Sequence, residues 1–132
     1  MHILIVDDCP EFKVQHVIRY FESKKLDFSY EIVKSYHSAS KYIAEHVNEI
    51  ELAIVDLGLP MFDNGENYNE LEGLVIVDRI LRKKISIPII INSTTEIPNE
   101  AEYFERYTNR NAIIKHVQFL DGKWLIDFIS QL

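Results

Sequence analysis

Short apolar runs alternate with amphipathic segments along the whole chain, and this alternation most constrains its fold. Five runs rich in Ile, Val and Leu each precede a segment whose apolar residues recur every three or four positions. Parallel strands need crossover helices between them, so this alternation predicts a parallel sheet covered on both faces. The predicted strands lie in residues 2–8, 28–34, 52–56, 87–92 and 111–116, and the predicted helices in residues 9–25, 38–50, 71–84, 97–111 and 121–132.

Three of the runs, ILIV, LAIV and PIII, are almost continuously apolar, as is typical of central strands that are buried on both sides. Five strand–helix units favour a flavodoxin-like (βα)5 fold of the α/β class, a three-layer sandwich whose doubly wound parallel sheet has the strand order 2-1-3-4-5. Within the predicted helices, Phe12, Val17, Ile18 and Phe21 follow helical spacing, and Ser38 is a candidate cap for the second helix.

Length and charge exclude several classes of protein. The 132 residues suit a single domain, and 47% hydrophobic with 27% charged residues is ordinary for a folded protein. A formal net charge of −7 opposes direct binding of nucleic acid. No apolar run approaches the roughly 20 residues that cross a membrane. With one cysteine and no secretory leader, the expected location is the cytoplasm.

Acidic side chains follow two of the predicted strands. Asp7 and Asp8 end the first strand and Asp56 ends the third, and the strand order 2-1-3-4-5 makes these strands neighbours. Three carboxylates in one partly buried cleft repel one another unless a cation is present. A hard divalent ion with oxygen ligands resolves this conflict, and Mg²⁺ suits it best.

Two further strand ends carry groups that could contact a phosphoryl group. Lys115 at the fifth strand could place an ammonium across the cleft, and Ser93 after the fourth could offer a hydroxyl, with Thr94 as its substitute. Phosphoryl transfer is catalysed mainly by positioning and electrostatics, and an aspartyl carboxylate can carry phosphate covalently. This constellation favours Asp56 as a residue exposed at a strand tip to be modified.

At this point the sequence resembles the receiver domains of two-component response regulators, the CheY-like domains. The matching stretches are ILIVDD, LAIVDLGLP, PIIINST and IIK, and the resemblance covers nearly the whole chain. It implies one receiver domain over residues 1–132. It also implies a phosphorelay function in which Asp56 accepts a phosphoryl group from a phosphohistidine in a Mg²⁺-dependent reaction and a conformational switch follows.

The resemblance also implies roles for individual residues. Asp56 would be the phosphoacceptor, contacted by Ser93 and Lys115, while Asp7, Asp8, Asp56 and the Gly58 carbonyl would hold Mg²⁺. The partners would be a sensor histidine kinase or phosphotransfer protein and a downstream effector. The output surface, which could also form a homodimer, would be the face of the fourth helix, fifth strand and fifth helix. Any catalysis would be limited to self-phosphorylation and autodephosphorylation.

Three departures from the receiver pattern stand out. Ala112 occupies the place of the usual switching aromatic, and His116 replaces the usual proline after the lysine, which would leave that peptide bond trans. An acidic insertion of about residues 61–72 lengthens the loop beside the site. Its acids could restrict access, tune metal affinity or bind a partner. These departures motivate an alternative function, a receiver-like interaction module that works without phosphate.

Simpler readings of the same residues stay open. Asp8 with Glu11 could form a capping box for the first helix, and Ser93 could belong to an ordinary Ser/Thr turn. Cys9 is expected to be a small packing residue whose thiolate the nearby acids disfavour. A haloacid-dehalogenase-type phosphatase would need a second Asp two residues after its nucleophile, and a topoisomerase–primase-type nuclease would need Asp-x-Asp after the third strand. Neither pattern is present.

Overall fold

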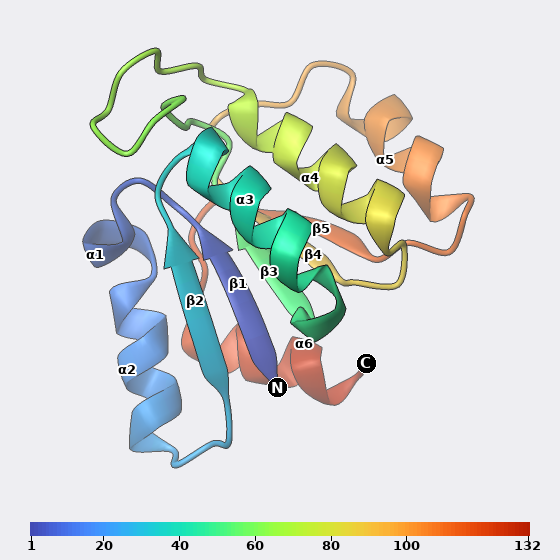
Figure 1. Cartoon of the computed structure of the whole chain (residues 1–132). Helices are drawn as coiled ribbons and strands as arrows, with labels where there is room; N and C mark the ends of the chain where they lie inside the picture. Colours follow the sequence, from blue (N-terminus) through green and yellow to red (C-terminus); the bar gives the residue numbers. More distant parts are fainter.

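A five-stranded, all-parallel sheet forms the centre of the computed structural model, which describes residues 1–132 (Figure 1). Its order, β2-β1-β3-β4-β5, is the one predicted. The strands are β1 (His2–Val6), β2 (Ser29–Val33), β3 (Leu52–Val55), β4 (Ile89–Asn92) and β5 (Ile114–Val117). The helices are α1 (Pro10–Lys13), α2 (Gln15–Ser23), α3 (Tyr36–His46), the 3-10 turn η1 (Val47–Glu49), α4 (Glu72–Lys83), α5 (Glu100–Thr108) and α6 (Gly122–Ser130).

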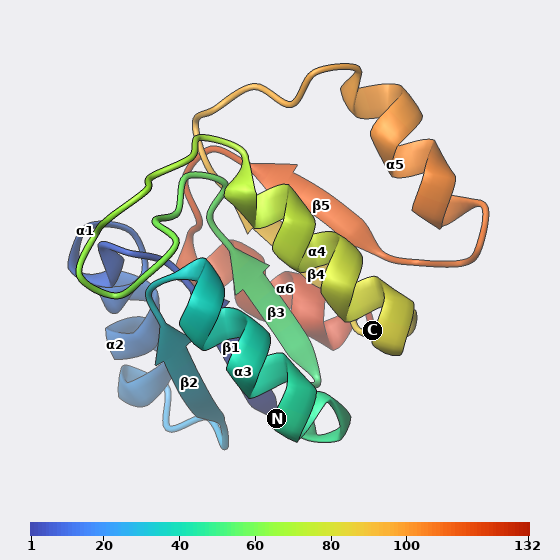
Figure 2. The ribbon, with the colours of Figure 1, turned by 45° about the horizontal axis from the view of Figure 1, so that its top comes forward.

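Helices cover both faces of the sheet, which gives the three layers expected (Figures 1 and 2). Side chains alternate along each strand, so every central strand contributes to two cores. Leu4, Val55 and Ile91 belong to the core under α3, α4 and α5, whereas Ile54 and Ile90 belong to the core under α2 and α6. This double burial explains the continuous apolar runs of β1, β3 and β4. No helix is both long and apolar enough to cross a membrane.

The first predicted helix is two helices. Its backbone breaks at Val14, whose φ of −123° is not helical, so α1 is a single turn and α2 starts afresh at Gln15. Val14 itself is buried in the core under α2 and α6. The grouping of Phe12 with Val17 and Ile18 on one face is therefore wrong, because Phe12 is 81% exposed.

The second predicted helix begins earlier than its sequence suggested. Ser35, not Ser38, is the N-cap of α3, and its hydroxyl accepts a hydrogen bond from the Ser38 amide. The Ser38 hydroxyl in turn accepts from the Ser35 amide, which completes a capping box with serine in the place of the usual Glu or Gln. The sequence hid this start because Tyr36 and His37 do not resemble a first helical turn.

Two tyrosines tie α5 to α4 in the region of Ala112. Tyr103 and Tyr107 are both buried, and both hydroxyls donate to Asp78 of α4. Ala112 lies in the same core, only 7% exposed. These aromatics therefore fill the core around the alanine.

The start of α4 lies tightly against the strand end that carries Asp56. The Gly73 amide donates to the Leu57 carbonyl at 2.8 Å, and a Cβ at Gly73 would lie 2.0 Å from the Asp56 carbonyl oxygen. That neighbour is backbone and cannot swing away. Only glycine permits this approach, which fixes α4 relative to the site.

We expect Gly73→Ala to lower the free energy of unfolding by about 2 kcal/mol or more, because the methyl group must displace backbone. Urea unfolding measures it. The matched control is Val75→Ala on the same helix, where the side chain is 44% exposed and the change should stay within about 0.5 kcal/mol. Equal effects of the two substitutions would contradict the tight approach.

Candidate functional site

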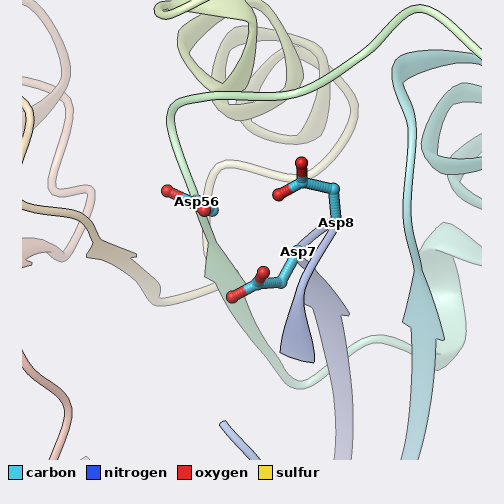
Figure 3. A group of neighbouring side chains, drawn as sticks. All are labelled: Asp7, Asp8 and Asp56. Carbon is cyan, nitrogen blue, oxygen red and sulfur yellow. The ribbon is translucent and has the colours of Figure 1, made fainter. Parts of the chain in front are cut away.

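Three carboxylates meet at the carboxyl end of the sheet. Asp7 and Asp8 follow β1 and Asp56 follows β3, and the three offer oxygens that lie within 4.8 Å of one another (Figure 3). Asp7 is 2% exposed and Asp56 4% exposed, while Asp8 is intermediate, so Asp56 is buried at its strand end and not exposed as expected. The structure thus brings together the three acids that the sequence singled out.

Strand register explains this convergence. Val6 of β1 pairs with Val55 of β3, and the Asp56 amide donates to the Val6 carbonyl at 2.8 Å, so Asp7 and Asp56 leave the sheet at the same level. Ile5 lies two residues before Asp7, and Ile54 lies two residues before Asp56. Both isoleucines belong to the core under α2 and α6. Alternation along the strands therefore directs both acids toward that face of the sheet.

The electrostatics of the cluster are unfavourable to three bare charges. Burial, the largest cause, and the charge of Asp56 together raise the pKa of Asp7 to about 6, although a hydrogen bond from the Cys9 amide lowers it. The pKa of Asp8 is also raised, first by burial and then by Asp56. The cluster therefore resists full ionisation unless cations approach.

The structure rejects the capping interpretation of Asp8. The N-cap of α1 is Cys9, without any side-chain capping hydrogen bond, and Asp8 accepts no hydrogen bond at the start of the helix. Cys9 is exposed rather than packed, contrary to expectation. The pKa of its thiol is raised by burial and by Asp8 and Glu11, which agrees with the inert thiol that the sequence indicated.

A lysine that the sequence analysis missed binds the candidate phosphoacceptor. Lys13 Nζ donates to Asp56 Oδ2 at 2.8 Å, and the Lys13 side chain is 35% exposed. Burial lowers the pKa of Lys13, but the hydrogen bond and charge of Asp56, together with Asp7 and Asp8, raise it above its usual value. The available hint was Pro10, which marks a helix start and places Lys13 one turn from the acid pair.

Ser93 lies at the end of β4, the strand beside β3. It is 2% exposed, and its hydroxyl accepts from the Thr95 amide at 3.1 Å. Ser93 therefore forms the Ser/Thr turn of the simpler interpretation, and this hydrogen bond leaves the hydroxyl proton of Ser93 free to donate. Thr94, the substitute, is exposed.

Lys115 does not end the fifth strand as expected. It is the second residue of β5, it is exposed, and it makes no ion pair. Lys115 pairs with Ile90 of β4, whereas Asn92, at the end of β4, pairs with Val117. Lys115 therefore comes two residues before the residue that lies level with the end of β4. Two residues are about 7 Å along a strand, so the Cα of Lys115 lies two residues before the strand ends that carry the carboxylates.

His116 secures the strand where a proline was expected. All peptide bonds are trans, as the replacement predicted. The His116 ring donates from Nε2 to the Ser93 carbonyl at 2.9 Å and contacts the Glu100 carboxylate through Nδ1. It thereby joins β5 to the loop that carries Ser93 and to the first turn of α5.

The acidic insertion folds back beside the carboxylates, close to α1 in both views (Figures 1 and 2). Its Tyr68 ring lies so close to Gly58 that a Cβ there would meet the phenol oxygen at 1.9 Å. Burial raises the pKa of Tyr68, and the charges of Asp8 and Asp56 raise it further. A tyrosine thus stands beside the expected carbonyl ligand, and no feature of the sequence indicated it.

The insertion is held at both ends. The amides of Tyr36 and His37 at the start of α3 donate to the carbonyls of Pro60 and Met61, both at 2.9 Å. Leu59 and Asn69 form an antiparallel bridge, and Ser35 donates to Asp63 at 2.6 Å. That hydrogen bond lowers the pKa of Asp63. One of its acids is therefore an anchor of the loop.

The donor set fits a small divalent cation. Three carboxylates with oxygens within 4.8 Å of one another, two of them with raised pKa values, are oxygen ligands in need of positive charge. Mg²⁺ accepts such ligands and commonly uses one or two carboxylates with water and phosphate. Asp7, Asp8 and Asp56 would hold it, and the Gly58 carbonyl is the fourth expected ligand.

No protein-family model matches the sequence, and no curated protein matches it. Solved structures do. A CheY-like response regulator receiver domain from Methanospirillum hungatei JF-1 has a TM-score of 0.67 at 21% identity, covering 98% of this chain and 90% of that one. The chain has the fold of CheY-like receiver domains. Two more receiver structures agree with this.

The first of these two is the CheX-CheY-BeF3-Mg complex from Borrelia burgdorferi, with a TM-score of 0.67 at 17% identity and coverage of 99% and 87%. The second is the BeF3-activated N-terminal receiver domain of Klebsiella pneumoniae RstA, with a TM-score of 0.64 at 19% identity and coverage of 99% and 97%. The receiver fold therefore extends over nearly the whole chain.

We expect the metal-free protein to become more stable as the pH falls from 7 to 5. The folded-state pKa of Asp7 is about 6, above its ordinary 3.8, so the folded state binds more protons in this range and loses stability as the pH rises. The gain is of the order of 2 kcal/mol at most. Urea unfolding in EDTA measures it.

Asp7→Asn should remove most of this pH dependence, whereas Glu22→Gln on the exposed side of α2 should retain it. Mg²⁺ at pH 7 should stabilise the wild type, because a bound cation stabilises the ionised carboxylates. An unchanged slope in Asp7→Asn would contradict the assignment of the buried proton to this residue.

Proposed function

We propose that residues 1–132 are one receiver domain of two-component signalling that accepts a phosphoryl group on Asp56 and controls a partner through a change of conformation. The observation that carries the proposal is the set of three carboxylates at the carboxyl end of the sheet, with Asp56 buried at the end of β3. The receiver fold supports it. The chain works in the cytoplasm, and its donor is a phosphohistidine on a sensor kinase or phosphotransfer protein.

In the transfer, a bond forms between an Asp56 carboxylate oxygen and the donor's phosphorus. The phosphorus–nitrogen bond breaks, and its electron pair stays on the donor imidazole. Ser93, whose hydroxyl proton is free, donates to a phosphoryl oxygen, and a nearby ammonium offsets the charge. Mg²⁺ held by the carboxylates would neutralise charge on the phosphoryl oxygens.

The output surface comprises α5, β5 and α6. His116 and Glu100 join the loop after β4 to α5 and β5, so a new hydrogen bond at Ser93 reaches this surface through packed contacts. Tyr103 and Tyr107 hold α5 against Asp78, and their rearrangement takes the place of the switch that Ala112 cannot provide. An effector protein or a second copy of the chain binds this surface.

A second candidate is a receiver-like interaction module that does not use phosphate. The observation that favours it is the exposed position of Lys115, which makes no ion pair. In that case the folded insertion and the helical faces would bind partners directly, and Asp56 would matter only for stability.

Backbone amide NMR distinguishes the two. We expect wild-type spectra to change with Mg²⁺ and again with beryllofluoride, a mimic of a phosphoryl group, and the second change should reach α5 and β5. Asp56→Asn should abolish the beryllofluoride response, because the acceptor oxygen is lost, while Asp27→Asn in an exposed loop should retain it. Mg²⁺ binding without any beryllofluoride response in the wild type would favour the interaction module.

A further inference from the structure

Asn92, the last residue of β4, lies in one row with two of the carboxylates. The strands β1, β3 and β4 are paired so that Asp7, Asp56 and Asn92 each follow residues that lie level with one another. Ile90 lies two residues before Asn92 and belongs to the core under α2 and α6, the face toward which both acids are directed. Neighbouring strands are about 4.8 Å apart, so Asn92 is the immediate neighbour of Asp56 across the sheet.

The Asn92 side chain is buried, and only one end of its amide is used. It is 2% exposed, and its Oδ1 accepts a hydrogen bond from the Leu120 amide at 3.1 Å. Because a backbone amide can only donate, this hydrogen bond fixes which end of the side chain is oxygen. The nitrogen, Nδ2, is buried and has no hydrogen-bond partner in the protein. A buried N–H group without an acceptor is costly, and native structures retain few of them.

The unused donor is turned away from the loop between β5 and α6. Leu120 in that loop binds the oxygen end of the amide, and β3 with Asp56 is the neighbour of β4 on the side opposite β5. The Asp56 carboxylate lies beyond hydrogen-bonding distance of Asn92 Nδ2, and its Oδ2 accepts from Lys13 at 2.8 Å. A group attached to Asp56 brings acceptor oxygens closer to Nδ2 than the carboxylate alone can.

We propose that Asn92 belongs to the phosphoacceptor site and that its side-chain amide donates a hydrogen bond to a phosphoryl oxygen on Asp56. The inference rests on the proposed function, since it assigns a further residue to the same transfer. In that transfer a bond forms between an Asp56 oxygen and phosphorus, and the phosphorus–nitrogen bond of the donor breaks with its electron pair left on the imidazole. Asn92 keeps both amide protons and contributes a hydrogen bond to a charged acceptor, which is stronger than one to a neutral acceptor.

A neutral donor leaves a distinct signature. The Asn92 amide nitrogen carries no charge and has no lone pair available for a cation, so its loss should leave the affinity for Mg²⁺ almost unchanged while weakening the binding of a phosphoryl group. A merely structural role would change both affinities, because the carboxylates and the phosphoryl group share one edge of the sheet. The two affinities together therefore separate a hydrogen bond to the phosphoryl group from a general loosening of the site.

Asn92→Leu tests the assignment, because leucine has nearly the shape of asparagine without its donor and acceptor. Amide NMR titrations give the affinity for Mg²⁺ and then for beryllofluoride in its presence. Asn92→Leu should weaken beryllofluoride binding by about tenfold, the size of one lost hydrogen bond to a charged group. Its affinity for Mg²⁺ should stay within about twofold of the wild type.

The matched control is His16→Ala. The exposed His16 donates from Nε2 to the Leu120 carbonyl at 2.9 Å, so this variant removes the other hydrogen bond to Leu120 and retains the Asn92 amide. Both affinities of His16→Ala should stay within about twofold of the wild type. Equal weakening of beryllofluoride binding in the two variants would overturn the proposal, because the position of the loop would then be the cause.

The wild type gives a second measurement, which decides the question if Asn92→Leu does not fold. Adding beryllofluoride to the Mg²⁺-loaded protein should shift the side-chain ¹⁵N and ¹H resonances of Asn92, and one of the two amide protons should show a nuclear Overhauser effect to fluorine. The side-chain amide of Asn48, exposed in η1, is the reference and should not move.

Unchanged beryllofluoride affinity in a folded Asn92→Leu would overturn the proposal. Unmoved Asn92 resonances in a wild type that responds elsewhere would overturn it too, because an amide that binds only water behaves in that way. Failure of the proposed function looks different: the wild type would then bind Mg²⁺ without any beryllofluoride response, and the role of Asn92 would be overturned with it.

Discussion

Mutual repulsion of Asp7, Asp8 and Asp56 is the constraint on which the rest of the site depends. A parallel sheet forces its strand ends to one edge, and alternation turns Asp7 and Asp56 to the same face, so the fold concentrates negative charge in a place poor in water. Part of the charge is offset by the Lys13 ammonium, and part is avoided by the raised pKa of Asp7. The remainder is an affinity for a hard cation. A site of this kind costs stability, which is the usual cost of a functional centre.

The departures from the receiver pattern are accommodated by local contacts. Where Ala112 leaves space, Tyr103 and Tyr107 fill the core and donate to Asp78, so α5 is joined to α4 by hydrogen bonds as well as by packing. Where His116 replaces proline, its ring bonds the loop of Ser93. At both positions, hydrogen bonds take the place of the packing or rigidity that the usual residue would supply. A buried polar network of this kind has few alternative arrangements, so a change at one member is transmitted to its neighbours.

The insertion shows how a long acidic segment becomes ordered. Its first carbonyls are bound by the free amides at the start of α3, and Asp63 accepts from the capping serine of the same helix. Helix starts have unpaired donors, and a loop rich in acceptors satisfies them. The consequence is that Tyr68 lies beside Gly58 and the carboxylates, which makes the insertion a wall of the site. Its exposed acids add to a chain that is already negative, and they disfavour anionic partners on that side.

The sequence by itself determined the sheet, its strand order and the meeting of Asp7, Asp8 and Asp56. Strands that are buried on both faces have continuous apolar sequences, and the carboxyl ends of parallel strands lie at one edge of the sheet. It also placed Ser93 at a strand end and foresaw the trans bond before His116. Only the tertiary structure decided the break at Val14, the cap at Ser35, the register that pairs Lys115 with Ile90, and the approach of Lys13 and Tyr68. These features depend on contacts between segments far apart in the chain, such as Lys13 with Asp56. The hydrophobic periodicity of a single segment does not indicate which distant side chain that segment will contact.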